Sequence, residues 1–208
     1  MQTLQFPAPA TKTVTIQVAP QDLAMLRQSG YRLCVAMQVD GDYDVVWQSA
    51  SQYLASNQFQ WVPWFQIFAT NRFFDGASVQ SLTNVVEIGL GEQSTLDQNG
   101  LLSPAMTMGP WQSVNLLNEY GLINPALNRL CTWIDGTKVA TPIYVRQQQA
   151  RVGTTAMTPV DKVLVWFEQN IQAGTMFSTA RSQAVEIDLT VANAATRLYQ
   201  EGAWTQAE

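Results

Sequence analysis

Apolar and polar residues alternate along most of this chain in short runs, which is typical of strands with one buried face. The segment Thr11–Val18, for example, places Val14, Ile16 and Val18 between polar threonines and a glutamine. Similar runs recur between turns rich in Gly, Pro and Asn. They cover residues 31–39, 43–49, 84–90, 111–117, 127–134, 138–146, 162–168, 184–190 and 195–200. Such a series of short strands predicts an all-β protein, built as an antiparallel β-sandwich or barrel, of which we favour the sandwich.

Two local patterns give sharper predictions. Pro20 begins a segment with Asp22 in its first turn and apolar residues on one face, and Gly30 closes it, so one short N-terminal helix is expected there. The tripeptide 40–42, Asp-Gly-Asp, separates two β-favouring runs, and this is a strong hairpin signal.

The most unusual stretch is 59–74, FQWVPWFQIFATNRFF, which is dense in aromatic residues and carries one charge, Arg72. Its aromatic side chains fall on both odd and even positions, so they cannot all face one way along a regular strand. Pro63 predicts a bulge or edge where the face switches. The stretch is therefore either the middle of a core or a binding surface, and the pattern leaves both open.

We expect one compact unit, 1–208, in which 101–110 is an irregular connector and 153–159 is a loop. An internal duplication is the alternative. Trp64-Phe65 and the segment VEIGL at 86–90 are matched about 100 residues later by Trp166-Phe167 and VEIDL at 185–189. The two pseudo-repeated halves would then be 11–103 and 111–204, with chance similarity between strands as the competing explanation.

Charge narrows the range of partners. The chain is 47% hydrophobic and only 13% charged, with a net charge of −5 and three lysines. A surface built from Gln, Ser, Thr and Asn is neutral and forms hydrogen bonds, whereas a nucleic-acid surface needs many cations. We therefore expect no nucleic-acid partner and no basic attraction to anionic lipid, while neutral head groups remain open.

The sequence predicts no transmembrane segment, because no apolar run is long enough to span a bilayer. Its beginning, MQTLQFPAPATKT, has no signal-peptide pattern, which favours a cytoplasmic protein or release by a non-classical route. Residues 1–11 are expected to form an extended arm. Cys34 and Cys131 both lie in apolar runs and are expected to be buried thiols, with one long-range disulfide as the alternative.

The chain contains no histidine, which excludes His-dependent catalytic triads. Without histidine, two cysteines are too few ligands for a structural zinc site. The acidic run Asp40, Asp42 and Asp44 lacks the glycine and glutamate of a calcium loop, so a hairpin turn is favoured over a metal site. A glycosidase-like pair formed by Glu87 with Glu186 or Asp188 stays open. We expect no cofactor, no metal and no catalytic residue.

These features favour a non-enzymatic, lectin-like binding protein that recognises a neutral polar ligand, either a glycan or a lipid head group. The predicted ligand-binding residues are Tyr53, Trp61, Trp64 and Arg72. A second hypothesis is a membrane-active, pore-forming toxin or cytolysin built on a β-sandwich, because aromatic residues favour the bilayer interface. A third is a self-associating structural or storage protein that forms a homo-oligomer.

Overall fold

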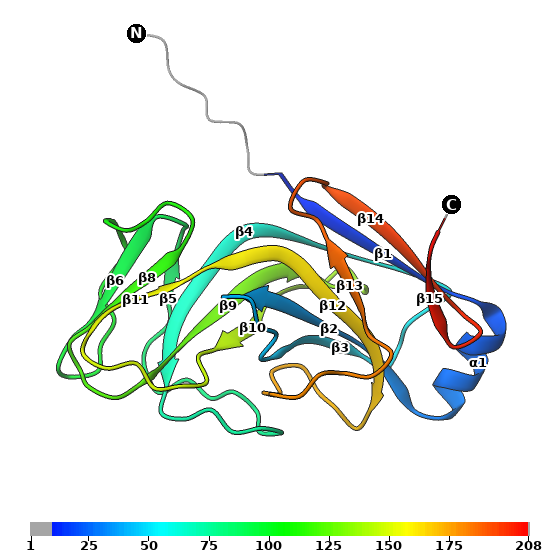
Figure 1. Cartoon of the computed structure of the whole chain (residues 1–208), viewed down its shortest axis with the longest axis horizontal. Coiled ribbons are helices and arrows are strands. Elements are labelled where there is room, and N and C mark those ends of the chain that lie inside the picture. The colour runs from blue at the N-terminus through cyan, green and yellow to red at the C-terminus, as the bar shows by residue number, and fades with distance from the viewer. Residues whose placement is uncertain (1–9, 208) are drawn as a thin grey trace, which may run out of the picture.

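The computed structural model describes residues 10–207, which form three β-sheets and one short helix (Figure 1). The helix is α1 (Pro20–Gln28). The strands are β1 (Lys12–Val18), β2 (Tyr31–Val39), β3 (Val46–Ala50), β4 (Ser56–Thr70), β5 (Val86–Ile88), β6 (Glu92–Leu96), β7 (Met106–Thr107), β8 (Val114–Asn118), β9 (Asn124–Thr132), β10 (Lys138–Val145), β11 (Gly153–Met157), β12 (Pro159–Gln169), β13 (Val185–Asp188), β14 (Ala194–Gln200) and β15 (Ala203–Gln206). The predicted all-β, sandwich-like fold with one short helix is confirmed.

Two of the sheets pack face to face around a common core. The main sheet has the order β10-β9-β4-β1-β14-β15, with β5 also paired to β4, and the second sheet has the order β13-β12-β2-β3. Alternate residues of each sheet point into the space between them and form one continuous apolar cluster. From the main sheet these include Val14, Ile16, Phe59 and Trp61, and from the second sheet Leu33, Val35, Val163 and Val165.

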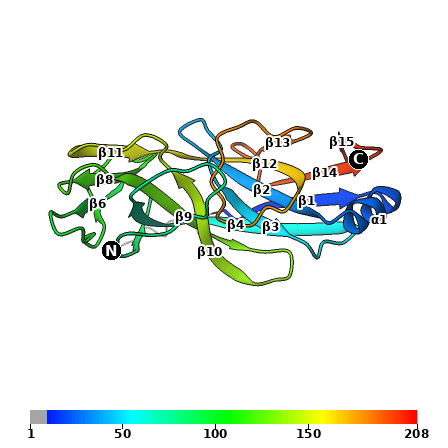
Figure 2. The same cartoon turned by 90° about the horizontal axis from the view of Figure 1, so that it is seen from below.

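The small sheet, with the order β11-β8-β6-β7, lies at one end of the molecule. The helix α1 and the hairpin β14–β15 lie at the opposite end, as Figures 1 and 2 show. The fold therefore has two distinct ends, each closed by different elements.

The sharper local predictions are confirmed. Helix α1 begins at Pro20 and is followed by Gly30, whose φ of +73° reverses the chain. The predicted hairpin is formed by β2 and β3, which pair antiparallel. The pairing of β4 with β9 shifts between Trp61 and Phe65, so the bulge predicted at Pro63 is present. Both cysteines are buried and free, as expected.

Other predictions about single elements are wrong. Residues 153–157 form β11 rather than a loop, because their Thr and Ala residues pair with β8. The sequence pattern also predicts none of the three strands β6, β7 and β15, which are short and carry little apolar alternation. The sheets also contain two parallel pairings, β1 with β14 and β6 with β8. The strands β1 and β14 come from opposite ends of the chain, so no hairpin forces them to be antiparallel.

The duplication has a limited structural counterpart. The VEI segments form β5 and β13, and each pairs antiparallel with the strand that carries its Trp-Phe dipeptide. However, Ile88 pairs with Phe65 itself, whereas Ile187 pairs with Val163, before the second dipeptide. The division into halves 11–103 and 111–204 stays a prediction. The N-terminal arm predicted for residues 1–11 falls mostly on residues 1–9, outside the described range.

A buried ion pair joins the two packed sheets. Arg129 of β9 is 2% exposed, and its Nη2 donates to Asp161 Oδ1 of β12 at 3.0 Å. The guanidinium also donates from Nε to the Val62 carbonyl, and it lies 4.8 Å from the centre of the Phe65 ring. The indole N–H of Trp61 donates to the same Asp161 oxygen at 3.0 Å. Burial lowers the pKa of Arg129 to about 10, yet it remains charged at neutral pH.

We expect Asp161→Asn to lower the free energy of unfolding by about 2–4 kcal/mol, because Arg129 then keeps a buried charge without its partner. The matched control is Lys162→Gln on the same strand. Lys162 pairs with Asp188 at 3.1 Å in a more exposed setting, so its loss should lower the free energy of unfolding much less than Asp161→Asn does. Denaturant titration of both variants measures the difference. An equal loss in the free energy of unfolding for the two substitutions would show that the inter-sheet pair stabilises the fold no more than an exposed pair does.

Candidate functional site

A hollow of about 460 Å³ lies where β12 ends and β2 begins. Tyr31 is the first residue of β2, and it pairs with Gln169, the last residue of β12. Helix α1 and the turn at Gly30 directly precede β2 in the chain, so Tyr31 lies at the junction of the helix and the second sheet. Its ring is partly exposed and packs at the edge of the main core.

The segment between β12 and β13 builds the wall of this hollow. It begins at Asn170, which adopts a φ of +58°, a conformation that asparagine tolerates better than most residues. The segment then crosses the outer face of the second sheet, where Ile171 and Phe177 cover Trp166 and Cys34. On its return it places Ala180, Arg181 and Ser182 opposite the end of β12.

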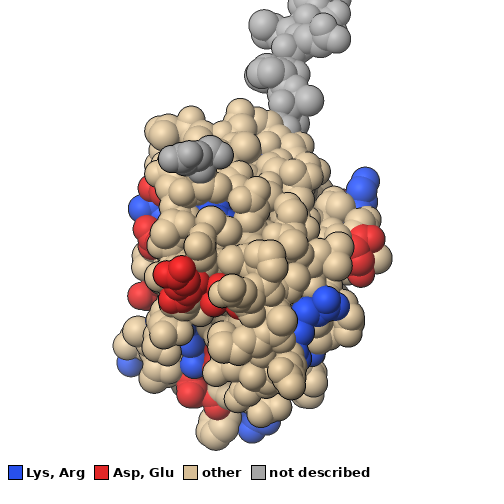
Figure 3. Space-filling view, turned by 90° about the vertical axis from the view of Figure 1, so that its right-hand side faces the viewer, with Lys and Arg blue, Asp and Glu red and all other residues tan. Residues whose placement is uncertain are grey.

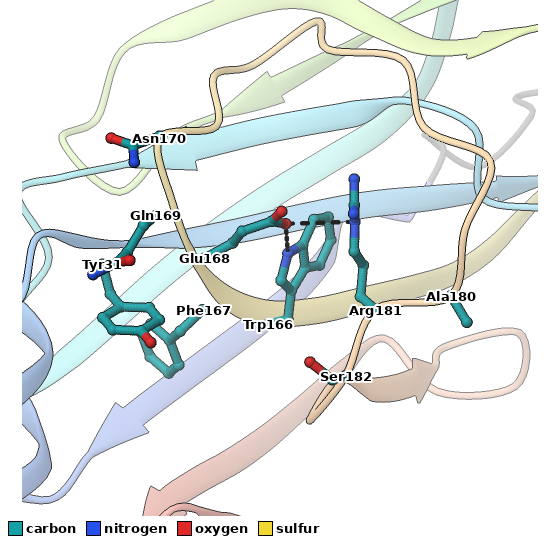
Figure 4. Close-up of a pocket in the computed structure, with 9 residues that line it drawn as sticks. All are labelled: Tyr31, Trp166, Phe167, Glu168, Gln169, Asn170, Ala180, Arg181 and Ser182. Carbon is teal, nitrogen blue, oxygen red and sulfur yellow. Dashed lines mark hydrogen bonds and ion pairs between the residues drawn. The ribbon is translucent and has the colours of Figure 1, made fainter. Parts of the chain in front are cut away.

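A charged group occupies the floor of the hollow (Figure 4). The indole N–H of Trp166 donates to Glu168 Oε2 at 2.6 Å, and Arg181 Nε lies 3.4 Å from the same oxygen. The guanidinium of Arg181 also lies over the Phe177 ring, 4.6 Å from its centre. Arg181 Nε is buried and makes no hydrogen bond within residues 10–207. The floor therefore presents a fixed carboxylate beside a guanidinium that has spare donor capacity.

Aromatic rings support the other side of the hollow. Phe167 stacks on Trp204 of β15 with ring centres 5.7 Å apart and contacts Tyr199 of β14 at 4.9 Å. Tyr53 lies behind this group, with its ring 5.5 Å from Phe167 and its hydroxyl donating to the Tyr31 carbonyl at 3.2 Å. Tyr199 and Trp204 of the main sheet thus fix the ring of Phe167, and Tyr53 contacts both Phe167 and the backbone of Tyr31.

Two further hollows adjoin the first and share Tyr31 with it. One, of about 240 Å³, is lined by Met25, Phe167 and Tyr199, and the other, of about 440 Å³, by Arg32, Gln52 and Asn170. In Figure 4, Tyr31 and Phe167 lie to one side of the Trp166–Glu168–Arg181 group. We name this region the Tyr31 site. It consists of Tyr31, Phe167, Glu168, Gln169, Asn170, Arg181 and Ser182.

The Tyr31 site offers mostly uncharged hydrogen-bonding groups around one aromatic ring. Gln169, Asn170 and Ser182 are exposed, and the single carboxylate is neutralised by the adjacent guanidinium. Hydroxyl groups can both donate to Glu168 and accept from Arg181, so a polyhydroxylated ligand matches this set. Figure 3 shows that the α1 and β15 end of the molecule is mostly uncharged, with scattered acidic and basic side chains between uncharged areas.

The structure does not bring the four predicted binding residues together. Tyr53 and Trp61 are buried, Trp64 is partly buried on β4, and Arg72 is exposed in the segment after β4. Trp61 lies beside a separate hollow of about 260 Å³, which Cys131 and Lys138 also line. Only Tyr53 touches the Tyr31 site, and it does so from behind. A ligand-binding role for these four residues stays a prediction.

None of the residues of the Tyr31 site lies in a distinctive sequence motif, so sequence patterns do not predict them. Trp166-Phe167 was singled out only as part of the repeat. A usable signal was the polar run Glu168-Gln169-Asn170 directly after an apolar strand, since side chains at strand ends are often placed on functional surfaces.

The carboxylates considered for a glycosidase are arranged differently. Glu186 and Asp188 both form ion pairs with Lys162, and Glu186 also accepts a hydrogen bond from the Tyr43 hydroxyl at 2.9 Å. Hydrogen bonds from the Thr190 side chain and backbone, together with Lys162, lower the pKa of Asp188 to about 2. A general acid needs a raised pKa, so Asp188 is poorly suited to that role. Glu87 lies in β5 of the main sheet, away from β13.

The acidic run at 40–44 forms a turn, as expected. Asp40 accepts hydrogen bonds from the Thr158 N–H at 2.8 Å and the Tyr144 hydroxyl at 3.2 Å. Asp44 is 2% exposed and accepts from Gln147 Nε2 at 2.6 Å. Burial, reinforced by the charges of Asp42 and Asp40, raises the pKa of Asp44 to about 6. Within residues 10–207 no cluster of three or more potential metal-ligating carboxylates or thiolates occurs.

Comparison of the chain with protein families, with curated proteins and with solved structures gave no match. Among the described residues, no helix has the length and apolar character needed to cross a bilayer. The function must therefore be argued from the site itself.

We expect Asp44→Asn to stabilise the protein at neutral pH, because the raised pKa means that ionised Asp44 disfavours the folded state. This penalty is absent below the unfolded-state pKa near 4 and grows as the pH rises towards 6. The difference in free energy of unfolding between Asp44→Asn and the natural chain should increase by about 1–3 kcal/mol between pH 4 and pH 7. Urea titrations across this range measure it.

The control for this experiment is Glu119→Gln, which changes an exposed carboxylate outside this turn. Its effect on stability should be small across the same pH range. A stability difference for Asp44→Asn that stays constant from pH 4 to pH 7 would rule out the burial effect.

Proposed function

We propose that this protein is a non-enzymatic, lectin-like binding protein that recognises a neutral, hydroxyl-rich ligand, a glycan, at the Tyr31 site. The observation that carries this proposal is that Tyr31, whose ring is partly exposed, lines three adjoining hollows. Amide and hydroxyl side chains contribute to each rim, beside the apolar residues of the smallest hollow and the charged residues Glu168, Arg181, Arg27 and Arg32 of the other two.

Each part of the site has a counterpart in a sugar. The apolar face of a pyranose ring packs against an aromatic ring such as that of Tyr31. Neighbouring hydroxyls donate to Glu168 and accept from Arg181, while Asn170 and Ser182 provide further uncharged partners. Because Trp166 and Phe177 already hold Glu168 and Arg181, little side-chain ordering remains for the ligand to impose.

The size and charge of the region also support a neutral ligand. The main hollow, at about 460 Å³, falls within the range of ordinary small-molecule sites. In the main hollow, the carboxylate of Glu168 disfavours an anionic ligand and the guanidinium of Arg181 disfavours a cationic one. Arg27 and Arg32 line the adjoining hollow of about 440 Å³ and not the main one. A neutral ligand avoids the cost of leaving either charge desolvated beside a like charge.

The test starts with a glycan array probed with the full chain, followed by titration calorimetry with the best oligosaccharide. Tyr31→Ala should weaken its binding about tenfold, because an aromatic contact contributes roughly 1–1.5 kcal/mol. Asn170→Gly should also weaken binding while keeping the left-handed backbone that this position requires. Melting temperatures confirm that each variant is folded.

Tyr31→Phe, Trp64→Ala and Arg72→Ala are the matched controls. The first keeps the ring, and the other two remove residues outside the Tyr31 site. All three should bind within about twofold of the natural chain. Equal binding by the natural chain and Tyr31→Ala would reject the Tyr31 site. Loss of binding in Trp64→Ala or Arg72→Ala would instead place the site at β4 and the segment that follows it. Absence of any bound glycan at millimolar concentration would reject the proposal.

A further inference from the structure

A second surface lies in the small sheet, at the end of the molecule away from α1 (Figures 1 and 2). Several large, exposed apolar side chains lie there on neighbouring segments of the chain. Trp111 is 77% exposed, Met108 67%, Met106 62% and Leu90 42%. We name this group the apolar tip, and it consists of Leu90, Met106, Met108 and Trp111.

Hydrogen bonds hold the segments of the apolar tip together at Gly91. The Gly91 N–H donates to the Ser113 carbonyl at 2.8 Å, and its carbonyl accepts from the Gly109 N–H at 3.0 Å. On the adjoining strands, Gln93 of β6 pairs with Met106 of β7. Leu90 is thereby brought beside the segment 106–111, which carries the other three residues, and this distinguishes the tip from apolar residues scattered singly over a surface.

The packing beneath the tip fixes its conformation. Asn115 is fully buried and donates from Nδ2 to the carbonyls of Glu92 and Ser113. A Cβ atom at Gly109 would lie 2.0 Å from that nitrogen, so only glycine fits there. Gly91 has a φ of +81° and lies against the backbone of Trp111. The exposed side chains therefore project from a rigid base rather than from a loose loop.

Charge around the tip is nearly absent. The sequence contains no lysine or arginine between Arg72 and Arg129. The carboxylate of Glu92, two residues after Leu90, accepts the Gly89 N–H at 2.7 Å. The segments that form the tip thus carry no cation of their own to attract an anionic surface, and they suit an electrically neutral one.

We propose that the apolar tip docks onto a lipid bilayer with neutral, zwitterionic head groups. Tryptophan favours the membrane interface, and methionine adapts its shape to irregular apolar surroundings. A second copy or another protein would need a larger face, since standard interfaces use about 20–30 residues on each side. The edge strand β7 has only two residues, so it offers little backbone for pairing with another sheet.

This proposal is independent of the glycan proposal, because it uses different residues at the other end of the fold. A chain docked through the tip would keep the Tyr31 site on the side away from the bilayer.

The experiment is flotation of the full chain with phosphatidylcholine vesicles, and with phosphatidylcholine vesicles that contain phosphatidylserine. The natural chain should float with both to a similar extent, with little change in high salt. The double variant Trp111→Ala, Met108→Ala should partition about tenfold more weakly, because binding scales with the buried apolar area. Phe74→Ala removes an aromatic side chain that is 64% exposed elsewhere and should leave partition unchanged.

Tryptophan fluorescence gives a second readout. Trp111 is the most exposed of the seven tryptophans, and the difference in acrylamide quenching between the natural chain and Trp111→Ala isolates its contribution from those of the partly exposed Trp64, Trp133 and Trp204. Vesicles should protect it from the quencher. Failure of the natural chain to float, flotation that survives in the double variant, or a requirement for phosphatidylserine would overturn the proposal. Concentration-dependent sedimentation that the double variant abolishes would do the same, because a second copy would then cover the tip.

Discussion

The fold depends on a charged contact across a largely apolar interior, the pair formed by Arg129 and Asp161, to which Lys12 adds a second cation 3.8 Å from the same carboxylate. It links β9 of the main sheet to β12 of the second sheet, and the indole of Trp61 shares the carboxylate. A buried guanidinium is tolerated only when it is paired and hydrogen-bonded, so the two sheets must meet in one register at this point. The apolar cluster around the pair supplies most of the stabilising burial, and the pair adds a geometric constraint on how the two sheets meet.

This constraint reaches the Tyr31 site through β12. The same strand carries Asp161 near its start and Trp166, Glu168 and Gln169 at its end. Fixing its register also fixes the pairing of Gln169 with Tyr31 and the position from which the covering segment 170–184 departs. The site is therefore formed by rigid elements on its floor, and only its wall comes from an irregular segment.

The sequence predicted elements whose signals are local. The helix after Pro20, the hairpin at 40–42 and the bulge at Pro63 each follow from the chemistry of a few adjacent residues. The burial of Tyr53, by contrast, depends on contacts with Phe167, far along the chain. The strands of the small sheet pair through polar residues, so periodicity gives little indication of them.

The candidate site was harder to predict than the fold for the same reason. The aromatic stretch at 59–74 was conspicuous, yet most of its rings fill the core, while Tyr31 stands alone in its segment. The most direct test is an NMR titration with a bound oligosaccharide. The account predicts a shift of the Trp166 indole N–H signal and of the backbone amides of Glu168, Asn170 and Ser182, with the Trp111 signal unchanged. Shifts confined to β4, to the small sheet, or absent throughout at saturating sugar would contradict it.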